Sequence, residues 1–456
     1  MLFAAVLLAR LAHARILWVE ECYPAAAALQ ILHGLIPYRD FFFDKPPGEA
    51  LVYLLWGAQD GALLRWAGAT FVCLCCWLIH KFALRLWGLR EAWYAAALLA
   101  FFLTFDTPSS VMALAPDLLM LAPHLAAVWF ACAAMPAAAG AMAAIALLLH
   151  PKGLLVLAVC LLAGNRNWVR ILLGFAVVTA GSLAALGLAG AWPGYWEQVW
   201  VWGFRYTGDT FLEDPFRSGL LRTAGWAGFH AALVVGTVWQ MLRDPEPRRR
   251  LFLIWLAVSL AGVAMGWRFF PRYYFALLPV MTLAAARGLC LMRAKHAFAV
   301  AALLVIPLIR FGPRYVQLWA GGENAWPDLA MNQDSHQAAS LVNREAGSGD
   351  TLLVWGYRPD LFVYTRLRTG TPFLDSQPLT GVIADRHLTE WRPSAPALSE
   401  ANRQMLIRYK PTFIVDGLGA YNPRLAIEQY PDLSQWLAGY ERIGATQGSV
   451  IYRRKR

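Results

Sequence analysis

Long apolar runs, rather than amphipathic stripes, dominate the first 320 residues of the chain. A helix needs roughly 17 to 25 residues to cross the hydrocarbon core of a bilayer, and lipid cannot satisfy an exposed backbone. These runs must therefore be helical if they lie in a membrane. The pattern predicts about eleven transmembrane helices, of which the pair 137–149 and 153–163 is short. They are placed at residues 1–17, 66–87, 92–105, 117–135, 137–149, 153–163, 168–190, 226–242, 250–266, 271–291 and 297–312.

The pattern changes after about residue 319, where no further apolar run is long enough to span. Short apolar segments bounded by turn residues predict strands, and segments with helical periodicity predict amphipathic helices. The predicted fold class is an α-helical polytopic membrane protein with a small C-terminal extracytoplasmic α/β domain. Residues 1–319 would form the transmembrane catalytic domain and residues 320–456 the soluble domain. The predicted strands are Thr351–Gly356 and Thr412–Asp416, the helices Ser335–Glu345 and Ser399–Tyr409, and the closing hairpin Tyr440–Gly444 with Ser449–Arg453.

Composition supports a membrane class: 59% of the residues are hydrophobic and 15% are charged, against about 25% charged in soluble domains. The net charge of +11 does not indicate nucleic acid, because the basic residues gather in alternate loops rather than on one face. The acidic residues in these same loops are only Glu91, Asp244 and Glu246. These basic residues are Lys81, Arg85, Arg90, Arg166, Arg170, Arg243, Arg248, Arg249, Arg250, Arg287, Arg293 and Lys295.

The basic loops predict the topology of the chain in the membrane. By the positive-inside rule they face the cytoplasm. The N-terminus is then cytoplasmic, and the segments 18–65, 191–225 and 313–456 lie on the outer side. Tryptophan-rich apolar stretches within 18–65 predict helices lying at the membrane interface, at residues 51–56 and 62–66.

The first outer loop, 18–65, contains the densest polar cluster in the sequence. Glu20 and Glu21 follow the first apolar run directly. Adjacent carboxylates near apolar surroundings resist ionising together, and a carboxyl with a raised pKa suits a general base. The alternative is that these acids only cap a helix and solvate a loop. The loop continues through Tyr38, Arg39, Asp40, Asp44, Lys45 and Pro46.

Asp117 is a second candidate acid, at the outer start of the predicted span 117–135. As a helix N-cap, its carboxylate would meet free backbone N–H groups, which alone explains an aspartate there. Both interpretations stay open on the sequence.

Four cations on the predicted outer side are candidates for binding a phosphate. A departing phosphate needs positive charge in a partly dry site. The break His150-Pro151-Lys152-Gly153 between two apolar segments is tolerated only where protein or a cavity satisfies the backbone. Each cation on its own is also a common interfacial anchor. The four candidates are Lys45, Lys152, Arg268 and Arg272.

These motifs resemble the GT-C superfamily of membrane glycosyltransferases, which includes protein O-mannosyltransferases and the bacterial aminoarabinose transferase of lipid A. The resemblance rests on the first outer loop, on the body of many spans and on the appended outer domain. The motifs are short. They are Glu20-Glu21, Gly34, Pro37-Tyr38-Arg39-Asp40-Phe41, Lys45-Pro46-Pro47, Ala115-Pro116-Asp117, Pro151-Lys152-Gly153 and the region Arg268–Pro279.

The resemblance implies a polyprenyl-phosphate sugar donor, a lipid, glycan or protein acceptor, and inverting transfer at the outer face of a bacterial inner membrane. The family's catalytic carboxylate, commonly Asp followed by Glu, falls on Glu20 followed by Glu21, so this chain carries Glu in place of Asp. The Lys-Pro motif, Lys45-Pro46, implies a phosphate contact, and the second acid is Asp117. Some relatives bind a divalent metal ion and others do not, so a metal is left open.

Two other classes compete with a glycosyltransferase. A secondary transporter would place ionisable residues near the bilayer midplane in two related halves, whereas here the acids gather at one surface and no halves match. A non-catalytic lipid or glycan assembly protein would not need paired carboxylates beside a Lys-Pro-Pro turn.

Overall fold

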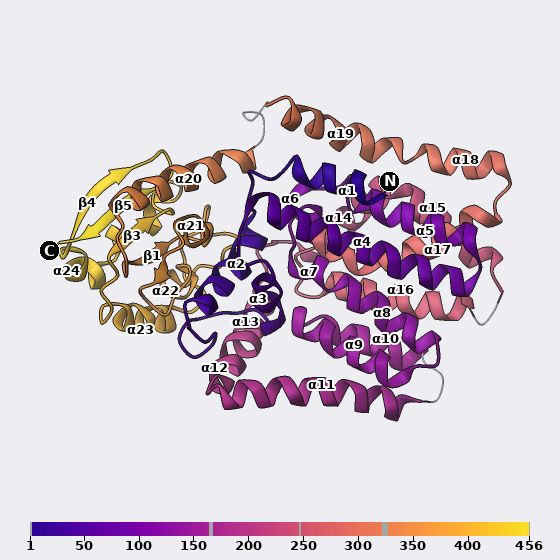
Figure 1. The fold of residues 1–456 in the computed structure, drawn as a ribbon, viewed down its shortest axis with the longest axis horizontal. Coiled ribbons are helices and arrows are strands. Elements are labelled where there is room, and N and C mark those ends of the chain that lie inside the picture. Colours follow the sequence, from indigo (N-terminus) through magenta and orange to yellow (C-terminus); the bar gives the residue numbers. More distant parts are fainter. Residues whose placement is uncertain (1, 164–166, 246–247, 322–326, 456) are drawn as a thin grey trace.

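The protein consists of a bundle of helices and a smaller mixed α/β domain that packs against one end of the bundle (Figure 1). The computed structural model describes residues 2–163, 167–245, 248–321 and 327–455. Arg166 and Glu246, used above in the charge pattern, lie outside the described residues. The C-terminus is at the far end of the α/β domain from the bundle.

The bundle is built from residues before about 320, and most of its helices run roughly parallel or antiparallel (Figure 1). They are α1 (Leu2–Leu11), α2 (Val19–Leu32), α3 (Pro47–Leu54), α4 (Gly61–Leu86), α5 (Leu89–Phe102), α6 (Pro108–Val111), α7 (Pro116–Leu119), α8 (Leu121–Cys132), α9 (Pro136–Leu149), α10 (Gly153–Ala163), α11 (Trp168–Leu188), α12 (Trp192–Tyr195), the π-helix η1 (Trp196–Val201), α13 (Trp202–Gly208), α14 (Pro215–Phe229), α15 (Ala231–Arg243), α16 (Arg248–Ala264), the 3-10 helix η2 (Pro271–Leu277), α17 (Leu278–Leu291), α18 (Ala294–Ala302) and α19 (Val305–Trp319).

Every predicted span contains a helix, but many of these helices are shorter than the apolar run that predicted them. Within the described residues, four helical segments are long and apolar enough to cross a membrane: Gly61–Leu86, Trp168–Leu188, Pro271–Leu291 and Ala294–Trp319. The total of eleven spans stays a prediction. Residues 62–66 belong to the start of α4 and not to a separate interfacial helix, because α4 runs as one helix from Gly61 to Leu86.

The C-terminal domain has a five-stranded mixed sheet in the order β2-β1-β3-β5-β4. Its strands are β1 (Thr351–Trp355), β2 (Arg368–Thr369), β3 (Phe413–Asp416), β4 (Tyr440–Ala445) and β5 (Val450–Arg454). β1 pairs parallel with β2 and β3, and β5 pairs antiparallel with β3 and β4. The two predicted strands and the closing hairpin are confirmed. β2 was not predicted, because its two residues are too few to show a period.

Helices flank this sheet, with α20 (Pro327–Glu345), α21 (Asp360–Thr365), α22 (Gln377–Thr380), α23 (Pro396–Leu406) and α24 (Ser434–Leu437). Short 3-10 turns lie at Pro423–Leu425, Ile427–Gln429 and Pro431–Leu433. α20 and α23 confirm the two predicted amphipathic helices. Every residue of β3 is buried, as expected for a strand covered on both faces.

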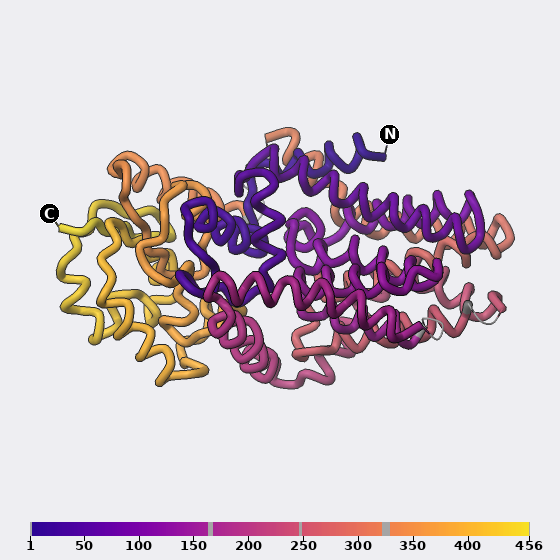
Figure 2. Tube along the Cα trace, turned by 60° about the horizontal axis from the view of Figure 1, so that its bottom comes forward, coloured from indigo at the N-terminus to yellow at the C-terminus, as the bar shows by residue number. Residues whose placement is uncertain are grey.

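α2 occupies the junction between the bundle and the C-terminal domain (Figures 1 and 2). Its middle turns, from Ala25 to Leu29, are at most 2% exposed, so this part of the first outer loop is enclosed by protein. The helix ends where Gly34 takes a φ of +81°, the left-handed conformation that glycine adopts at little steric cost. Two side chains of α2 bind the C-terminal domain: Gln30 accepts from Thr369 N at 2.8 Å, and His33 Nε2 lies 3.1 Å from Arg366 O.

Candidate active site

Two acidic and two basic side chains from four elements meet at the end of the bundle that faces the C-terminal domain. Arg272, at the start of η2, forms an ion pair with Glu20 in the first turn of α2. Arg272 Nε also lies 3.6 Å from Asp117 Oδ2, and Lys152 Nζ lies 3.9 Å from Asp117 Oδ1. The structure therefore brings together four residues that are far apart in sequence.

The turn between α9 and α10 supplies Lys152 and a histidine that the sequence analysis did not propose as a site residue. His150 Nδ1 accepts from Lys152 N at 3.0 Å, which leaves Nε2 to carry the proton, 3.6 Å from Asp117 Oδ1. Burial, followed by nearby cations, lowers the pKa of His150 to about 4 although Asp117 opposes this. The imidazole is therefore neutral at pH 7 and faces Asp117 as a donor.

Lys152 is a buried ammonium without a hydrogen-bond acceptor among the described residues. Its Nζ lies 3.5 Å from the centroid of the Tyr273 ring. Burial lowers its pKa to about 8, with Asp117 opposing and Arg272 adding to the shift. A buried donor without an acceptor is costly unless a ligand supplies one, so this ammonium is suited to bind an anionic group.

Lys45 lies on the loop between α2 and α3, 3.0 Å from Asp44 Oδ1. The buried Tyr38 hydroxyl donates to the Lys45 carbonyl at 2.7 Å, and Tyr38 itself has a φ of +69°. Pro46 then provides the N-cap of α3. The Tyr38–Pro46 segment thus fixes the backbone of Lys45, while its side chain stays about one-third exposed.

Two carboxyls that the sequence analysis missed lie close to this cation. Glu49 is 1% exposed, and neither of its carboxyl oxygens has a hydrogen-bond partner among the described residues. Burial raises the pKa of Glu49 well above its ordinary value, against the nearby Lys45 ammonium. Burial, with Asp44 as a like charge, also raises the pKa of Asp375 to about 7. Glu49 follows Lys45 by only four residues, so its proximity in the sequence was a usable signal, whereas Asp375 comes from the C-terminal domain and gave none.

Glu20 and Glu21 have separate environments, because consecutive residues of a helix point about 100° apart. Glu21 is fully buried and accepts from both terminal nitrogens of Arg65, at 2.6 and 2.9 Å, and from Leu114 N at 2.7 Å. Arg65 also donates to the carbonyls of Ile16 and Met112. Glu21 therefore ties α2 to the segment that leads into Asp117, and Glu20 alone of the pair faces the four-residue cluster.

Arg268 precedes Arg272 by four residues, in the non-helical segment before η2, and points toward the C-terminal domain. Its Nε donates to Asp385 at 2.7 Å, its Nη2 donates to Asp209 O at 2.5 Å, and the guanidinium lies 3.7 Å from the centroid of the Tyr206 ring. The side chain is fully buried. These contacts dock the C-terminal domain onto the bundle, and they favour a structural role for Arg268.

Arg39 and Asp40 form an ion pair with each other at 2.9 Å and lie outside the cluster. Asp40 Oδ2 accepts from Ile36 N at 2.8 Å, and Arg39 donates to Ala189 O. This pair shapes the turn after α2.

Within the described residues, no group of three or more His, Cys, Asp or Glu side chains is arranged to hold a metal ion. The donor set explains this: Asp117 faces Lys152 and Arg272, Glu20 faces Arg272, and Asp44 faces Lys45. Each of these three carboxylates therefore has a cation of the chain as a neighbour.

Comparison with known proteins gives matches at the level of structure. No family model matches the sequence, and no curated protein matches it. The structure of ArnT from Cupriavidus metallidurans bound to undecaprenyl phosphate matches with a TM-score of 0.62 at 14% identity, covering 99% of this chain and 97% of ArnT. An oligosaccharyltransferase from Archaeoglobus fulgidus, in complex with Zn and sulfate, matches with a TM-score of 0.52 at 14% identity, covering 100% of this chain and 73% of the enzyme.

These matches show that the chain has the fold shared by ArnT and the archaeal oligosaccharyltransferase, and this fold agrees with the resemblance drawn from the sequence motifs. Like ArnT, the chain has a helical body followed by a small mixed sheet. A further structure, AglB from Archaeoglobus fulgidus in complex with an inhibitory peptide and a dolichol-phosphate, matches with a TM-score of 0.51 at 13% identity.

Proposed function

We propose that this protein is an integral membrane glycosyltransferase that moves a sugar from a polyprenyl-phosphate donor to an acceptor hydroxyl, with inversion at the anomeric carbon. The single observation that carries the proposal is the gathering of Glu20, Asp117, Lys152 and Arg272 at one end of a GT-C fold. A carboxylate beside one buried and one partly buried cation suits a reaction that removes a proton from one partner and releases a phosphate from the other.

In the proposed reaction the Glu20 carboxylate takes the proton of the acceptor hydroxyl. The acceptor oxygen forms a bond to the anomeric carbon as the bond from that carbon to the donor phosphate breaks. The donor is a phosphodiester and the product a phosphomonoester, so negative charge develops on the departing lipid phosphate. Lys152, Arg272 and Lys45 would stabilise this charge, and Asp117 would orient Lys152 and Arg272.

The membrane placement is part of the same proposal. The site and the C-terminal domain would face the extracytoplasmic side of a bacterial inner membrane, with the N-terminus cytoplasmic. A transporter is disfavoured because α2, which carries Glu20, lies at the junction with the C-terminal domain (Figure 1) and not midway along the bundle. The acceptor would be a lipid, glycan or protein that reaches the cluster from the outer side.

The test is a transfer assay on the purified chain in proteoliposomes, with a panel of polyprenyl-phosphate sugars and release of polyprenyl phosphate as the readout. Glu20→Gln should lower the rate by about 100-fold or more, the loss typical of a removed general base. Glu197→Gln is the matched control, because Glu197 is an exposed acid away from the cluster. Wild-type rates in Glu20→Gln would refute the base, and no release with any donor would refute the function.

A further inference from the structure

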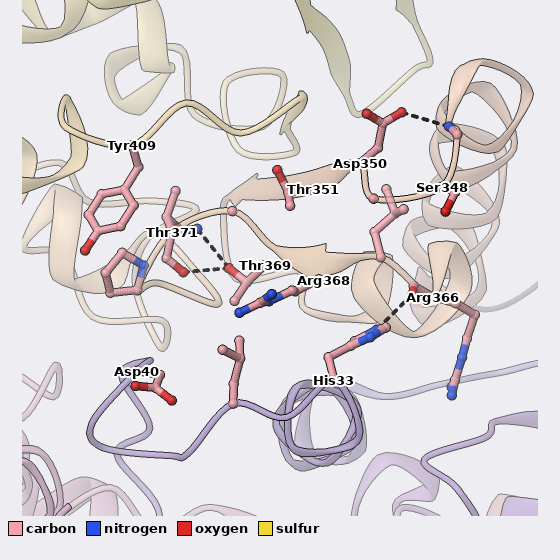
Figure 3. Close-up of a pocket in the computed structure, with 16 residues that line it drawn as sticks. His33, Asp40, Ser348, Asp350, Thr351, Arg366, Arg368, Thr369, Thr371 and Tyr409 are labelled. Carbon is pink, nitrogen blue, oxygen red and sulfur yellow. Dashed lines mark hydrogen bonds between the residues drawn. The ribbon is translucent and has the colours of Figure 1, made fainter. Parts of the chain in front are cut away.

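A pocket of about 630 Å³ lies between the end of α2 and the edge of the C-terminal sheet (Figure 3). Its lining comes from both parts of the protein: His33, Leu35 and Asp40 after α2, and residues 347–351, 366–372 and Tyr409 of the C-terminal domain. Its volume falls within the usual range for ligand pockets. None of its residues belongs to the cluster around Glu20.

The chemistry of the lining fits an uncharged, hydroxyl-rich ligand. The lining contains two carboxylates, of Asp40 and Asp350, and two guanidinium groups, of Arg366 and Arg368, so the lining residues themselves carry no net formal charge. Polar groups and apolar surface alternate around it, because Leu35, Pro372 and the Tyr409 ring also face it. Sugars present both hydroxyl groups and apolar ring faces.

Arg368 is the donor in this pocket that is most available to a ligand. It is exposed and makes no hydrogen bond to another described residue, although a guanidinium offers five N–H donors. Arg366, by contrast, is occupied by the carbonyls of Ala58 and Gly57, at 2.8 and 3.1 Å. Asp350 accepts from Gly347 N at 2.8 Å, which shapes the loop at the pocket rim.

The pocket is rigidly connected to the candidate active site. His33 caps the C-terminal end of α2, and Glu20 lies in the first turn of the same helix. At 1.5 Å per residue these positions are about 20 Å apart along the helix axis. A second connection runs through the loop after α2, where Phe42 N donates to Pro372 O at 2.7 Å. Phe42 precedes Asp44 by two residues, and Pro372 precedes Asp375 by three.

We propose that this pocket is a saccharide-binding subsite that holds a sugar unit of the acceptor about 20 Å from the hydroxyl that reacts at Glu20. The assignment to the acceptor depends on the proposed function, and the binding itself does not. An acceptor that fills both positions is an oligosaccharide or glycolipid several sugar units long. The pocket would thereby select extended acceptors over single sugars.

The test uses the full chain in lipid nanodiscs and measures protection of backbone amides from hydrogen exchange. The probes are neutral hexasaccharides of glucose, mannose and galactose, a hexauronate, and inorganic phosphate. At least one neutral hexasaccharide should protect residues 347–351 and 366–372. Arg368→Ala should weaken this binding about tenfold, as expected for a hydrogen bond to a charged group. Arg442→Ala, an exposed arginine on β4, should bind as the wild type does.

Three outcomes would overturn the subsite: no hexasaccharide protects the two segments, Arg368→Ala binds with wild-type affinity, or phosphate alone gives the same protection. The Glu20→Gln variant separates this proposal from the proposed function. If it binds the hexasaccharide and the wild type shows no transfer, only the transferase proposal fails. If transfer occurs and neither segment is protected, only the subsite fails.

Discussion

Glu20 and Glu21 are neighbours in the chain, yet one faces the cation cluster and the other is enclosed by Arg65 and Leu114 N. The sequence analysis left open which of them is the base. The Glu21 carboxylate is fully buried and already accepts three hydrogen bonds. An acceptor hydroxyl therefore cannot approach its oxygens. We therefore propose Glu20 as the base and Glu21 as the residue that holds α2 in place.

The separate environments of Glu20 and Glu21 predict that glutamine at position 21 lowers stability, whereas glutamine at position 20 lowers activity. Glu21→Gln removes a charge from a fully buried pair and leaves Arg65 uncompensated, which typically costs about 3–5 kcal/mol. We expect a large drop in the unfolding temperature of the purified protein. Glu20→Gln, at a partly exposed position, should unfold near the wild-type temperature while losing transfer. Equal thermal stability of the two variants in the same detergent would contradict the structural role of Glu21.

Lys152 predicts a dependence on alkaline pH. Its pKa of about 8 lies below the ordinary 10.5 because it is buried, so the ammonium is charged below about pH 8 and neutral above it. A neutral amine does not attract a phosphate. The value of kcat/KM for the donor should therefore fall as the pH rises through about 8, since this ratio reports groups of the free enzyme.

The control for this prediction uses a cation that stays charged. Lys152→Arg should lose the alkaline decrease, whatever its absolute rate, because a guanidinium does not deprotonate in this range. Lys410→Arg, at an exposed site in the C-terminal domain, should leave the profile unchanged. A decrease near pH 8 that persists in Lys152→Arg would assign it to another group.

At the scale of elements, α9 and α11 approach closely through small residues. A side chain at Gly174 would place its Cβ 2.0 Å from Ala137 O, and one at Gly140 would place it 1.8 Å from Ile171 O. Both obstacles are backbone atoms, which cannot move aside cheaply. Such reciprocal contacts between small residues are a common way for membrane helices to associate.

Gly174→Leu should therefore separate α11 from α9 and lower the unfolding temperature. Gly181→Leu is the matched control on the same helix, because nothing lies within 4 Å of a Cβ at that position. We expect Gly181→Leu to keep the wild-type unfolding temperature. Thermal unfolding of both variants in one detergent is the measurement, and equal losses would contradict the close packing of α9 against α11 as the cause.

At the scale of the whole molecule, the C-terminal domain contributes a side chain to the candidate site. Asp375 reaches the Lys45 region from this domain, and the buried pair of Arg268 with Asp385 docks the domain on the bundle. Bonds from Gln30 and His33 secure the same interface from α2. The domain boundary near residue 320, drawn from the sequence, stays a prediction.

The proposed topology predicts which surfaces a membrane-impermeant maleimide can reach in intact cells. Ser340→Cys, on the exposed face of α20, should add labelling over the wild type without permeabilisation. Arg90→Cys, exposed at the start of α5, should add labelling only after the membrane is opened, because its loop is predicted to be cytoplasmic. The reverse pattern would invert the topology.

The sequence by itself determined the helical membrane-type body, the strands β1, β3, β4 and β5, the two amphipathic helices of the C-terminal domain and the residue types of the candidate site. These features follow from local periodicity and composition, which a chain carries at any stage of folding. Only the tertiary structure decided that Glu20 and not Glu21 faces Arg272, that Arg268 binds Asp385, and that Glu49 and Asp375 join the site. Those outcomes depend on contacts between residues far apart in the chain, such as the 252 residues that separate Glu20 from Arg272, and on side-chain directions that change by about 100° from one helical residue to the next.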